Sequence, residues 1–345
     1  MTPKPADLSE FQALTELAEL RRVTSDLQVK LRQAKASKEE LIRAAHDGAR
    51  DAAMILGNPP KVPRPKRDAR QGRAEVALLH LSDWQLGKRT DTYNSDVALK
   101  RVAMIGEKLV KLVEIERADH PVRECHNMLG GDLAEGASIF PGQAFEIDSG
   151  LFRQSFNCVG AIEQLVRLQL ETFERVVCWE VDGNHGRLGR KGEAPREDNA
   201  DLFIYREARE RLSEYERAGR LEWHARERFY QIVEIGNYRA LLVHGDQIKQ
   251  FGGNLPAFGI ARKVGSWAAG VLPEFTDCYL GHFHQPMVLP LANGRGRTFV
   301  NPSIESDSVY AQEFVAASGT PGQRLNFVDP KAGRVTSERI VWVDG

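Results

Sequence analysis

The stretch "VALLHLSDWQLGK", residues 76–88, joins a run of apolar side chains to a polar turn. The apolar run is typical of a buried strand. It ends at Asp83, and Gln85 follows two positions later. An acidic side chain at the carboxyl end of a buried strand is well placed for a ligand site in an α/β fold.

The same alternation of short apolar runs and amphipathic stretches continues along the chain and predicts an α/β fold. Helical stretches are expected around 97–117, 151–175 and 197–218. Further strands are expected at "CHNMLGG" (125–131), "VVCWEV" (176–181), "FYQIVEI" (229–235), "RALLVHG" (239–245) and "DCYLGH" (277–282). After His284 the sequence favours strands and turns, which we expect to complete a second sheet.

Composition excludes several classes of protein. The chain has 345 residues, 42% of them hydrophobic, which is enough for one large domain with an appendage. A net charge of −1 means that attraction to a polyanion must come from local clusters of Lys and Arg. The four cysteines form no C-x-x-C pair, so we expect buried free thiols in a reducing, intracellular compartment. The sequence has no signal-peptide pattern and no run of about 18 apolar residues, so a cytoplasmic protein without membrane partners is expected.

The first 57 residues are predicted to form an N-terminal helical segment, either a coiled coil or a hairpin. Apolar side chains recur every seven positions there, at Leu20, Leu27, Ala34 and Leu41. This segment could pack on its own catalytic domain, join two chains in a homodimer, or bind DNA. Residues 58–73 form a basic, proline-rich stretch that is expected to be an extended linker and could lie along a phosphate backbone. The catalytic domain is then residues 74–345.

Five predicted strands end in polar clusters that contain metal-ligand side chains. The clusters are Asp83 with Gln85, Asp132 in "GGDLAEG", Asn184 with His185 in "DGNHGR", His244 in "VHGD", and His282 with His284 in "GHFHQP". Singly, such residues are more often helix caps, turn residues or hydrogen-bonded histidines. Together, in a fixed order at strand ends, they predict one convergent site.

These motifs, over residues 76–302, resemble those of the calcineurin-like metallophosphoesterases. Within that family they resemble the DNA-repair exonuclease subunits of the SbcD type and their phage-encoded relatives. The family pattern is D-x-H, G-D, G-N-H-[DE], a lone His before Gly, and G-H-x-H. The resemblance implies a four-layer α-β-β-α sandwich, to which this chain adds its N-terminal helical extension.

The resemblance also implies a binuclear metal centre. Two divalent ions would be bridged by Asp132, the first held also by Asp83, Gln85 and His284, the second by Asn184, His244 and His282. Mn²⁺ is the expected metal, with Fe, Zn or Mg as alternatives. Together the ions would activate a water for attack on phosphorus. His185 would be the catalytic residue that is not a ligand, stabilising the transition state or protonating the leaving alkoxide.

Two residues depart from the family pattern. Gln85 replaces a histidine, and because an amide oxygen is the weaker ligand, the first ion should bind less tightly and lean toward Mn or Mg. Gly186 replaces the acidic residue that commonly follows the catalytic histidine. The group that orients His185 must then come from elsewhere, with Asp182, Glu197 and Asp201 as candidates.

Two loops beside these motifs bear on the substrate. The loop "RLGRKGEAPRE", residues 187–197, is either a phosphate-binding loop or a solvated one, and it supplies Arg187, Arg190 and Lys191 as candidate substrate contacts. The loop at 135–148 carries Phe140 and Phe145, which would either stack on unpaired bases or anchor the loop in the core.

The sequence therefore favours a metal-dependent phosphodiesterase with nucleic acid, and DNA in particular, as substrate. The alternatives are a phosphomonoesterase acting on a protein or small molecule, and a non-catalytic binding or scaffold protein with a degenerate metal site. The repair exonucleases usually continue into a DNA-capping domain and a segment that docks on an ATPase, whereas only residues 285–345 remain here. A stand-alone enzyme is the simpler expectation.

Overall fold

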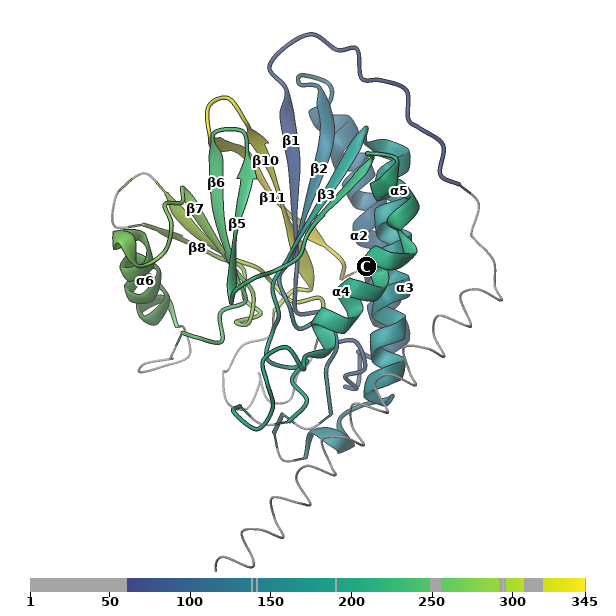
Figure 1. The fold of residues 1–345 in the computed structure, drawn as a ribbon, viewed down its shortest axis with the longest axis vertical. Helices are drawn as coiled ribbons and strands as arrows, with labels where there is room; N and C mark the ends of the chain where they lie inside the picture. The colour runs from purple at the N-terminus through teal and green to yellow at the C-terminus, as the bar shows by residue number, and fades with distance from the viewer. Residues whose placement is uncertain are drawn as a thin grey trace, which may run out of the picture. The chain divides into compact units, whose positions relative to one another are not determined.

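A computed structural model describes residues 61–137, 139–140, 142–189, 191–248, 256–291, 294, 296–306 and 319–344 of the chain. The predicted helical segment 1–57 lies outside these residues. The described part contains two β-sheets and a set of helices (Figure 1), as expected of an α/β protein. Among its helices, none combines the length and apolarity that crossing a membrane requires.

The first sheet contains six strands. In spatial order they are β11 (Arg334–Trp342), β10 (Gly322–Asp329), β1 (Glu75–Leu81), β2 (Val122–Leu129), β3 (Arg175–Glu180) and β4 (Leu221–His224). Strands β1 to β4 run parallel to one another, whereas β10 is antiparallel to both β1 and β11. Four of the strands therefore end at the same edge of this sheet.

The second sheet contains five strands. Their order is β5 (Tyr230–Ile235), β6 (Tyr238–Val243), β7 (Asp277–Leu280), β9 (Arg297–Val300) and β8 (Met287–Pro290). Strands β6, β7 and β9 are parallel, and the edge strands β5 and β8 are antiparallel to their neighbours. Strands β6 and β7 correspond to two of the predicted runs that end in histidine motifs.

The expectation that the C-terminus completes the second sheet is only half right. Strands β8 and β9 join that sheet, but β10 and β11 extend the first one. All eight residues of β10 are buried, which requires cover on both faces. Strand β10 pairs with β1 in a register that sets Leu78 opposite Asn326, and this pairing places β10 between two cores. Phe327 packs in the core beneath the helices, and Val328 packs in the core between the sheets.

The predicted helices form close to the expected places. They are α2 (Ser95–Glu116), α3 (Leu151–Thr172), α4 (Ala200–Arg211) and α5 (Ser213–Arg217), and they lie along one side of the first sheet (Figure 1). Helix α2 begins where the Asn94 side chain accepts a hydrogen bond from the Val97 N–H at 3.0 Å. Its buried residues recur at helical spacing: Ala98, Val102, Ile105, Leu109 and Val113. The short 3₁₀ helix η1 (Gln143–Phe145) lies in the loop after β2.

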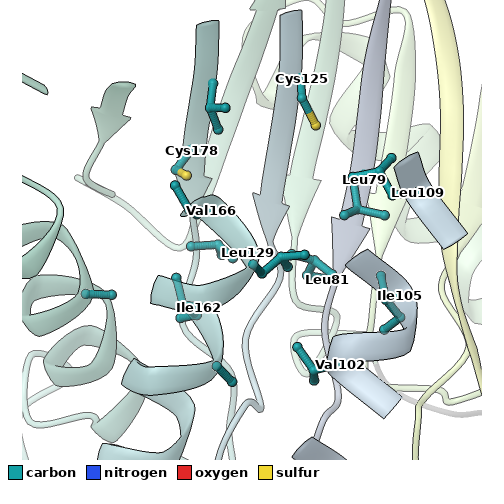
Figure 2. Packing of buried hydrophobic residues seen from close by; sticks show 14 of the residues in the cluster. Leu79, Leu81, Val102, Ile105, Leu109, Cys125, Leu129, Ile162, Val166 and Cys178 are labelled. Carbon is teal, nitrogen blue, oxygen red and sulfur yellow. The ribbon is translucent and has the colours of Figure 1, made fainter. Parts of the chain in front are cut away.

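Strand β1 faces two different cores. Leu79 and Leu81 pack against Ile105 and Leu109 of α2, together with residues of α3 (Figure 2). Leu78, on the other face, belongs to the cluster between the sheets, with Met128, Val177, Tyr238, Leu242 and Phe299. This double burial explains why the run at 76–81 does not alternate between apolar and polar residues.

Helix α6 (Ala257–Ser266), which the sequence reading did not anticipate, continues into the π-helical turn η2 (Trp267–Val271). Ile260, Val264 and Trp267 pack against Leu241 and other apolar residues of the second sheet. All four cysteines are free and buried, as expected, and burial raises the pKa of each thiol.

The described end of the proline-rich stretch is bound to the domain rather than extended in solvent. Arg220 donates to the carbonyl oxygens of Val62 (2.9 Å) and Pro63 (3.1 Å). The buried carboxylate of Asp68 accepts from the Val122 N–H at 3.3 Å. Val122 and Arg220 lie at or beside the starts of β2 and β4. Residues 62–68 therefore run along the amino-terminal edge of the first sheet.

Replacing Ile105 by Ala should lower the free energy of unfolding by about 2–5 kcal/mol, because the fully buried side chain leaves a cavity between α2 and β1. Ile115→Ala is the matched control on the same helix. Its side chain is 60% exposed, so the same substitution should cost no more than about 0.5 kcal/mol. Chemical denaturation measures both; equal losses would contradict the assignment of the buried face of α2.

Candidate metal centre

The two sheets bring their histidine and carboxylate motifs to one place. Asp83 follows β1, Asp132 follows β2, and His244 and His282 follow β6 and β7. The backbone N–H of Asp83 donates to Gly131 O at 3.0 Å, which joins the first two loops. The His282 N–H donates to Asp83 Oδ1 at 2.9 Å, which joins one sheet to the other. The predicted convergence at the carboxyl ends of the strands is thus present.

The backbone at these motifs is strained. Among the described residues, the non-glycine positions with a left-handed backbone are Asp83 (φ 55°), Gln85 (φ 42°), Asp132 (φ 56°), His282 (φ 68°) and His284 (φ 58°). Each such residue costs roughly 1–2 kcal/mol, and strain of this kind persists where surrounding contacts impose it. Every one of the five is a predicted metal ligand. Strain confined to predicted ligands is typical of a functional site.

The ligands predicted for the second ion form a compact group. One possible ligand atom from each of Asp132, His244 and His282 lies within 4.8 Å of the others. His244 Nδ1 donates to Gly130 O at 2.8 Å, which fixes the ring so that Nε2 faces Asp132 Oδ2 at 2.9 Å. The carboxylate of Asp132 raises the pKa of His244 to about 10, although burial alone would lower it.

Three of the residues predicted to hold the second ion have a buried atom without a well-oriented hydrogen-bond partner. These atoms are Asp132 Oδ2, Asn184 Oδ1 and His244 Nε2. Leaving such an atom unsatisfied costs about 1–3 kcal/mol each. A carboxylate oxygen, an amide oxygen and an imidazole nitrogen are all suitable ligands for a divalent transition metal. An ion among Asp132, His244 and His282 would coordinate Asp132 Oδ2 and His244 Nε2, so these residues fit a metal at this position.

The residues predicted for the first ion also lie together. Asp83 is fully buried, and its Oδ2 accepts from Ser82 Oγ at 2.6 Å. Its Oδ1 lies 3.4 Å from His284 Nε2. Burial would raise the pKa of Asp83, but His284 and His244 hold it below its usual range. A carboxylate and an imidazole are therefore in place on this side of the centre.

Gln85 lies inside the same site, and it is 2% exposed. Its amide oxygen accepts a hydrogen bond from Lys88 Nζ at 3.2 Å. Its amide nitrogen lies 3.2 Å from His284 Nε2 and 3.4 Å from His185 Nε2. The nitrogen end of the amide therefore faces the histidines, and the oxygen end faces a lysine.

The group that orients His185 is Glu135, which the sequence reading missed. His185 Nδ1 lies 2.9 Å from the backbone oxygen of Glu135 and 3.3 Å from its carboxylate. Burial opposes a charge on the ring, but the carboxylates of Glu135 and Asp132 raise the pKa of His185 to about 10. Glu135 is fully buried three residues after Asp132, in the quoted motif "GGDLAEG". An acidic residue so near Asp132 was the signal that could have identified it.

The three residues expected to orient His185 have other roles. Asp182 pairs with Arg196 at 3.1 Å and with Arg226 at 2.8 Å. Glu197 is exposed. Asp201 is buried and accepts backbone N–H bonds from Asp132 (2.9 Å), Leu133 (3.1 Å) and Gly183 (2.9 Å). It therefore fixes the two loops that carry Asp132 and Asn184, because one carboxylate binds the backbone of both.

The predicted substrate contacts are only partly available. Arg187 is half-buried and pairs with Asp246, the last residue of the "VHGD" motif that contains His244. Lys191 is exposed, and Arg190 lies outside the described residues. Phe140 is 38% exposed with its ring edge-on to His185, at a centroid distance of 6.5 Å, and Phe145 is 83% exposed. Neither phenylalanine is a buried loop anchor.

Comparisons with known proteins give structural neighbours only. No protein-family model matches the chain, and no curated protein matches it significantly. Vps29 of Entamoeba histolytica, solved with Zn²⁺, matches 77% of this chain and 99% of its own at 10% identity, with a TM-score of 0.34. A novel archaeal phosphodiesterase matches 76% and 99% at 10% identity and a TM-score of 0.36. A predicted phosphoesterase of Streptococcus pneumoniae matches 78% and 99% at 15% identity and a TM-score of 0.30.

The chain resembles the calcineurin-like metallophosphoesterases. At such identities and TM-scores no property of the three neighbours carries over to it. The resemblance rests on the five motifs and on the fold that brings Asp132, His244 and His282 within 4.8 Å.

Replacing Asn184 by Ala should separate metal binding from folding. In the presence of a chelator, the variant should be at least as stable as the wild type, because the substitution removes the buried Asn184 Oδ1, which lacks a hydrogen-bond partner. With Mn²⁺ it should lose most of the stabilisation that the ion gives the wild type. Thermal denaturation with EDTA and with Mn²⁺ measures both effects.

Asn199→Ala is the matched control. Its side chain accepts from the Asp201 N–H and donates to Gly183 O, both at 2.9 Å, at the start of α4. Its loss should cost about 0.5–2 kcal/mol with or without metal. A variant of Asn184 that is destabilised equally in both conditions would show a structural role instead of a ligand role.

Proposed function

We propose that this protein is a divalent-metal-dependent phosphodiesterase that hydrolyses nucleic acid, with DNA as substrate and Mn²⁺ as the preferred ion. The observation that carries the proposal is the compact group of buried ligand side chains Asp132, His244 and His282, with a charged histidine, His185, beside Asp132. A divalent ion bound there would supply Lewis-acid activation of water and of the phosphoryl oxygens. The proposal includes the four-layer α-β-β-α sandwich, with α2 to α5 on one outer face and α6 on the other.

His185 is assigned the role of general acid. Its Nδ1 is held by Glu135, which leaves Nε2 facing the centre of the site. A proton on Nε2 can pass to the alkoxide that departs from a phosphodiester, and such proton transfer contributes about 10²–10⁴ in rate. Glu135 keeps the ring charged and correctly oriented, so it acts as a positioning residue.

The rim of the site supports a diester of nucleic acid over a phosphomonoester. Phe140 lies beside His185 and is exposed, and stacking of a base on such a ring contributes about 1–3 kcal/mol. A monoester dianion calls for extra cations at its terminal oxygens. In the described part of the rim, Arg187 is already paired with Asp246 and Arg196 with Asp182.

His185→Ala should slow the hydrolysis of DNA by about 10²–10⁴, because an alkoxide leaving group needs its proton. Hydrolysis of bis(p-nitrophenyl) phosphate should fall much less, since nitrophenolate departs without one. Both rates are measured with Mn²⁺ on single-stranded and double-stranded DNA, with EDTA as the metal-free control. His224→Ala, which removes a histidine of β4, serves as the matched variant and should leave both rates unchanged.

If His185→Ala slows the hydrolysis of DNA and of bis(p-nitrophenyl) phosphate equally, His185 is not the general acid. Faster turnover of p-nitrophenyl phosphate than of any diester would identify a phosphomonoesterase. No turnover of any substrate by a chain that binds Mn²⁺ would favour the binding or scaffold alternative.

We further propose that residues 1–57, which lie outside the described residues, join two chains in a homodimer. Deleting residues 1–61 should convert a dimer to a monomer in sedimentation while leaving the hydrolysis of bis(p-nitrophenyl) phosphate unchanged. The cut keeps Val62, which Arg220 and Tyr215 bind, and so preserves the anchored stretch. A wild-type chain that sediments as a monomer would contradict the proposed dimer. Weaker DNA binding by the truncated monomer would show that the deleted segment helps to position the substrate.

A further inference from the structure

Lys88 is a cation built into the metal centre. Its Nζ lies 2.8 Å from Glu305 Oε2 and 3.2 Å from Gln85 Oε1, and its side chain is 11% exposed. Glu305 is itself buried, and its backbone N–H donates to Ser303 Oγ, which in turn donates to the backbone oxygen of Asp83. The lysine is therefore held on the same loops that position Asp83. An ammonium so constrained is unlike the solvated lysines of a protein surface.

The contacts of Gln85 identify the two ends of its amide. Lysine can only donate hydrogen bonds, so the atom that faces Lys88 Nζ is the amide oxygen. The NH₂ group then points at His284 Nε2, the atom that would otherwise face a metal ion beside Asp83. A donor group aimed at this position repels a cation, whereas a ligating histidine would bind one.

The two halves of the centre thus differ. On one side, Asp132, Asn184 and His244 present buried oxygen and nitrogen atoms that lack a well-oriented hydrogen bond. On the other side, Asp83 accepts from Ser82 Oγ and from the His282 N–H, and Gln85 presents its nitrogen.

We propose that the chain binds one divalent ion tightly, at Asp132, Asn184, His244 and His282, and that the ammonium of Lys88 supplies the positive charge on the side of Asp83 and His284. Gln85 is then the hydrogen-bonded link that holds Lys88 in place, and it is not the oxygen ligand that the sequence suggested. This inference rests on the proposed function and refines it.

The test measures metal content and turnover separately. Wild-type protein, freed of metal and then equilibrated with Mn²⁺, should retain one equivalent after gel filtration and give the electron paramagnetic resonance spectrum of an isolated ion. Gln85→Ala should keep that equivalent, with its dissociation constant changed by no more than the roughly 10- to 100-fold that loss of an outer contact causes.

Lys88→Met should keep one equivalent of Mn²⁺ and lose turnover of DNA, because charge is removed without removing a ligand. The double variant Gln85→His/Lys88→Met should bind a second ion, show the spectrum of a coupled pair, and recover turnover. Lys100→Met, at an exposed position on α2, is the matched control and should behave as the wild type. Should Lys88→Met fail to fold, Lys88→Met/Glu305→Gln removes both members of the ion pair and carries the same expectation.

Two tightly bound ions in the wild type, falling to one in Gln85→Ala, would overturn the inference and leave the proposed function standing. Unchanged turnover in Lys88→Met would likewise overturn it. A folded wild-type chain that binds no Mn²⁺ and cleaves no diester would overturn the proposed function, and this inference with it.

Discussion

The buried carboxylate of Asp132 is the point on which the site depends. It is 1% exposed, and its Oδ1 accepts a hydrogen bond from the backbone N–H of His185 at 2.7 Å. Its Oδ2 faces His244 Nε2, which follows a strand of the other sheet, at 2.9 Å. The imidazoles of His244 and His185 keep its pKa low although burial would raise it. A buried charge costs several kcal/mol unless it is compensated. The loops of both sheets therefore converge on this one group, which a metal ion would complete.

The cost of this arrangement is concentrated at the predicted ligands. Five of them take up left-handed backbone, and three of their atoms lack a well-oriented hydrogen bond. The surrounding structure holds them there: Asp201 binds three backbone N–H groups of the loops after β2 and β3. Ser303 and Asn301 bind the loop after β1 through Asp83 O and Ser82 Oγ. The core between the first sheet and its helices, and the core between the two sheets, provide the stability that offsets this strain.

The polar residues around the ligands decide what chemistry the centre can support. Glu135 keeps His185 charged and fixes the direction of its ring, while Lys88 and Glu305 form an ion pair beside Gln85. Exposed Phe140 gives the rim an apolar face beside His185. A charged imidazole, a fixed ammonium and an aromatic surface are compatible with the proposed cleavage of a nucleic-acid diester.

Much of this could be predicted from the chain itself, because the local signals were strong. The burial of residues 76–81, the helices near 97–117 and 151–175, and the clusters of ligand side chains at strand ends all follow from short-range patterns. Other features depended on contacts between residues far apart in the sequence. The pairing of β10 with β1, the choice of Glu135 over Asp182, Glu197 and Asp201, and the Lys88–Glu305 contact across 217 positions were decided only by the tertiary structure. The physical reason is that a ligand-rich sequence motif specifies which atoms are available, whereas their partners, charge state and direction are fixed by what the fold packs against them.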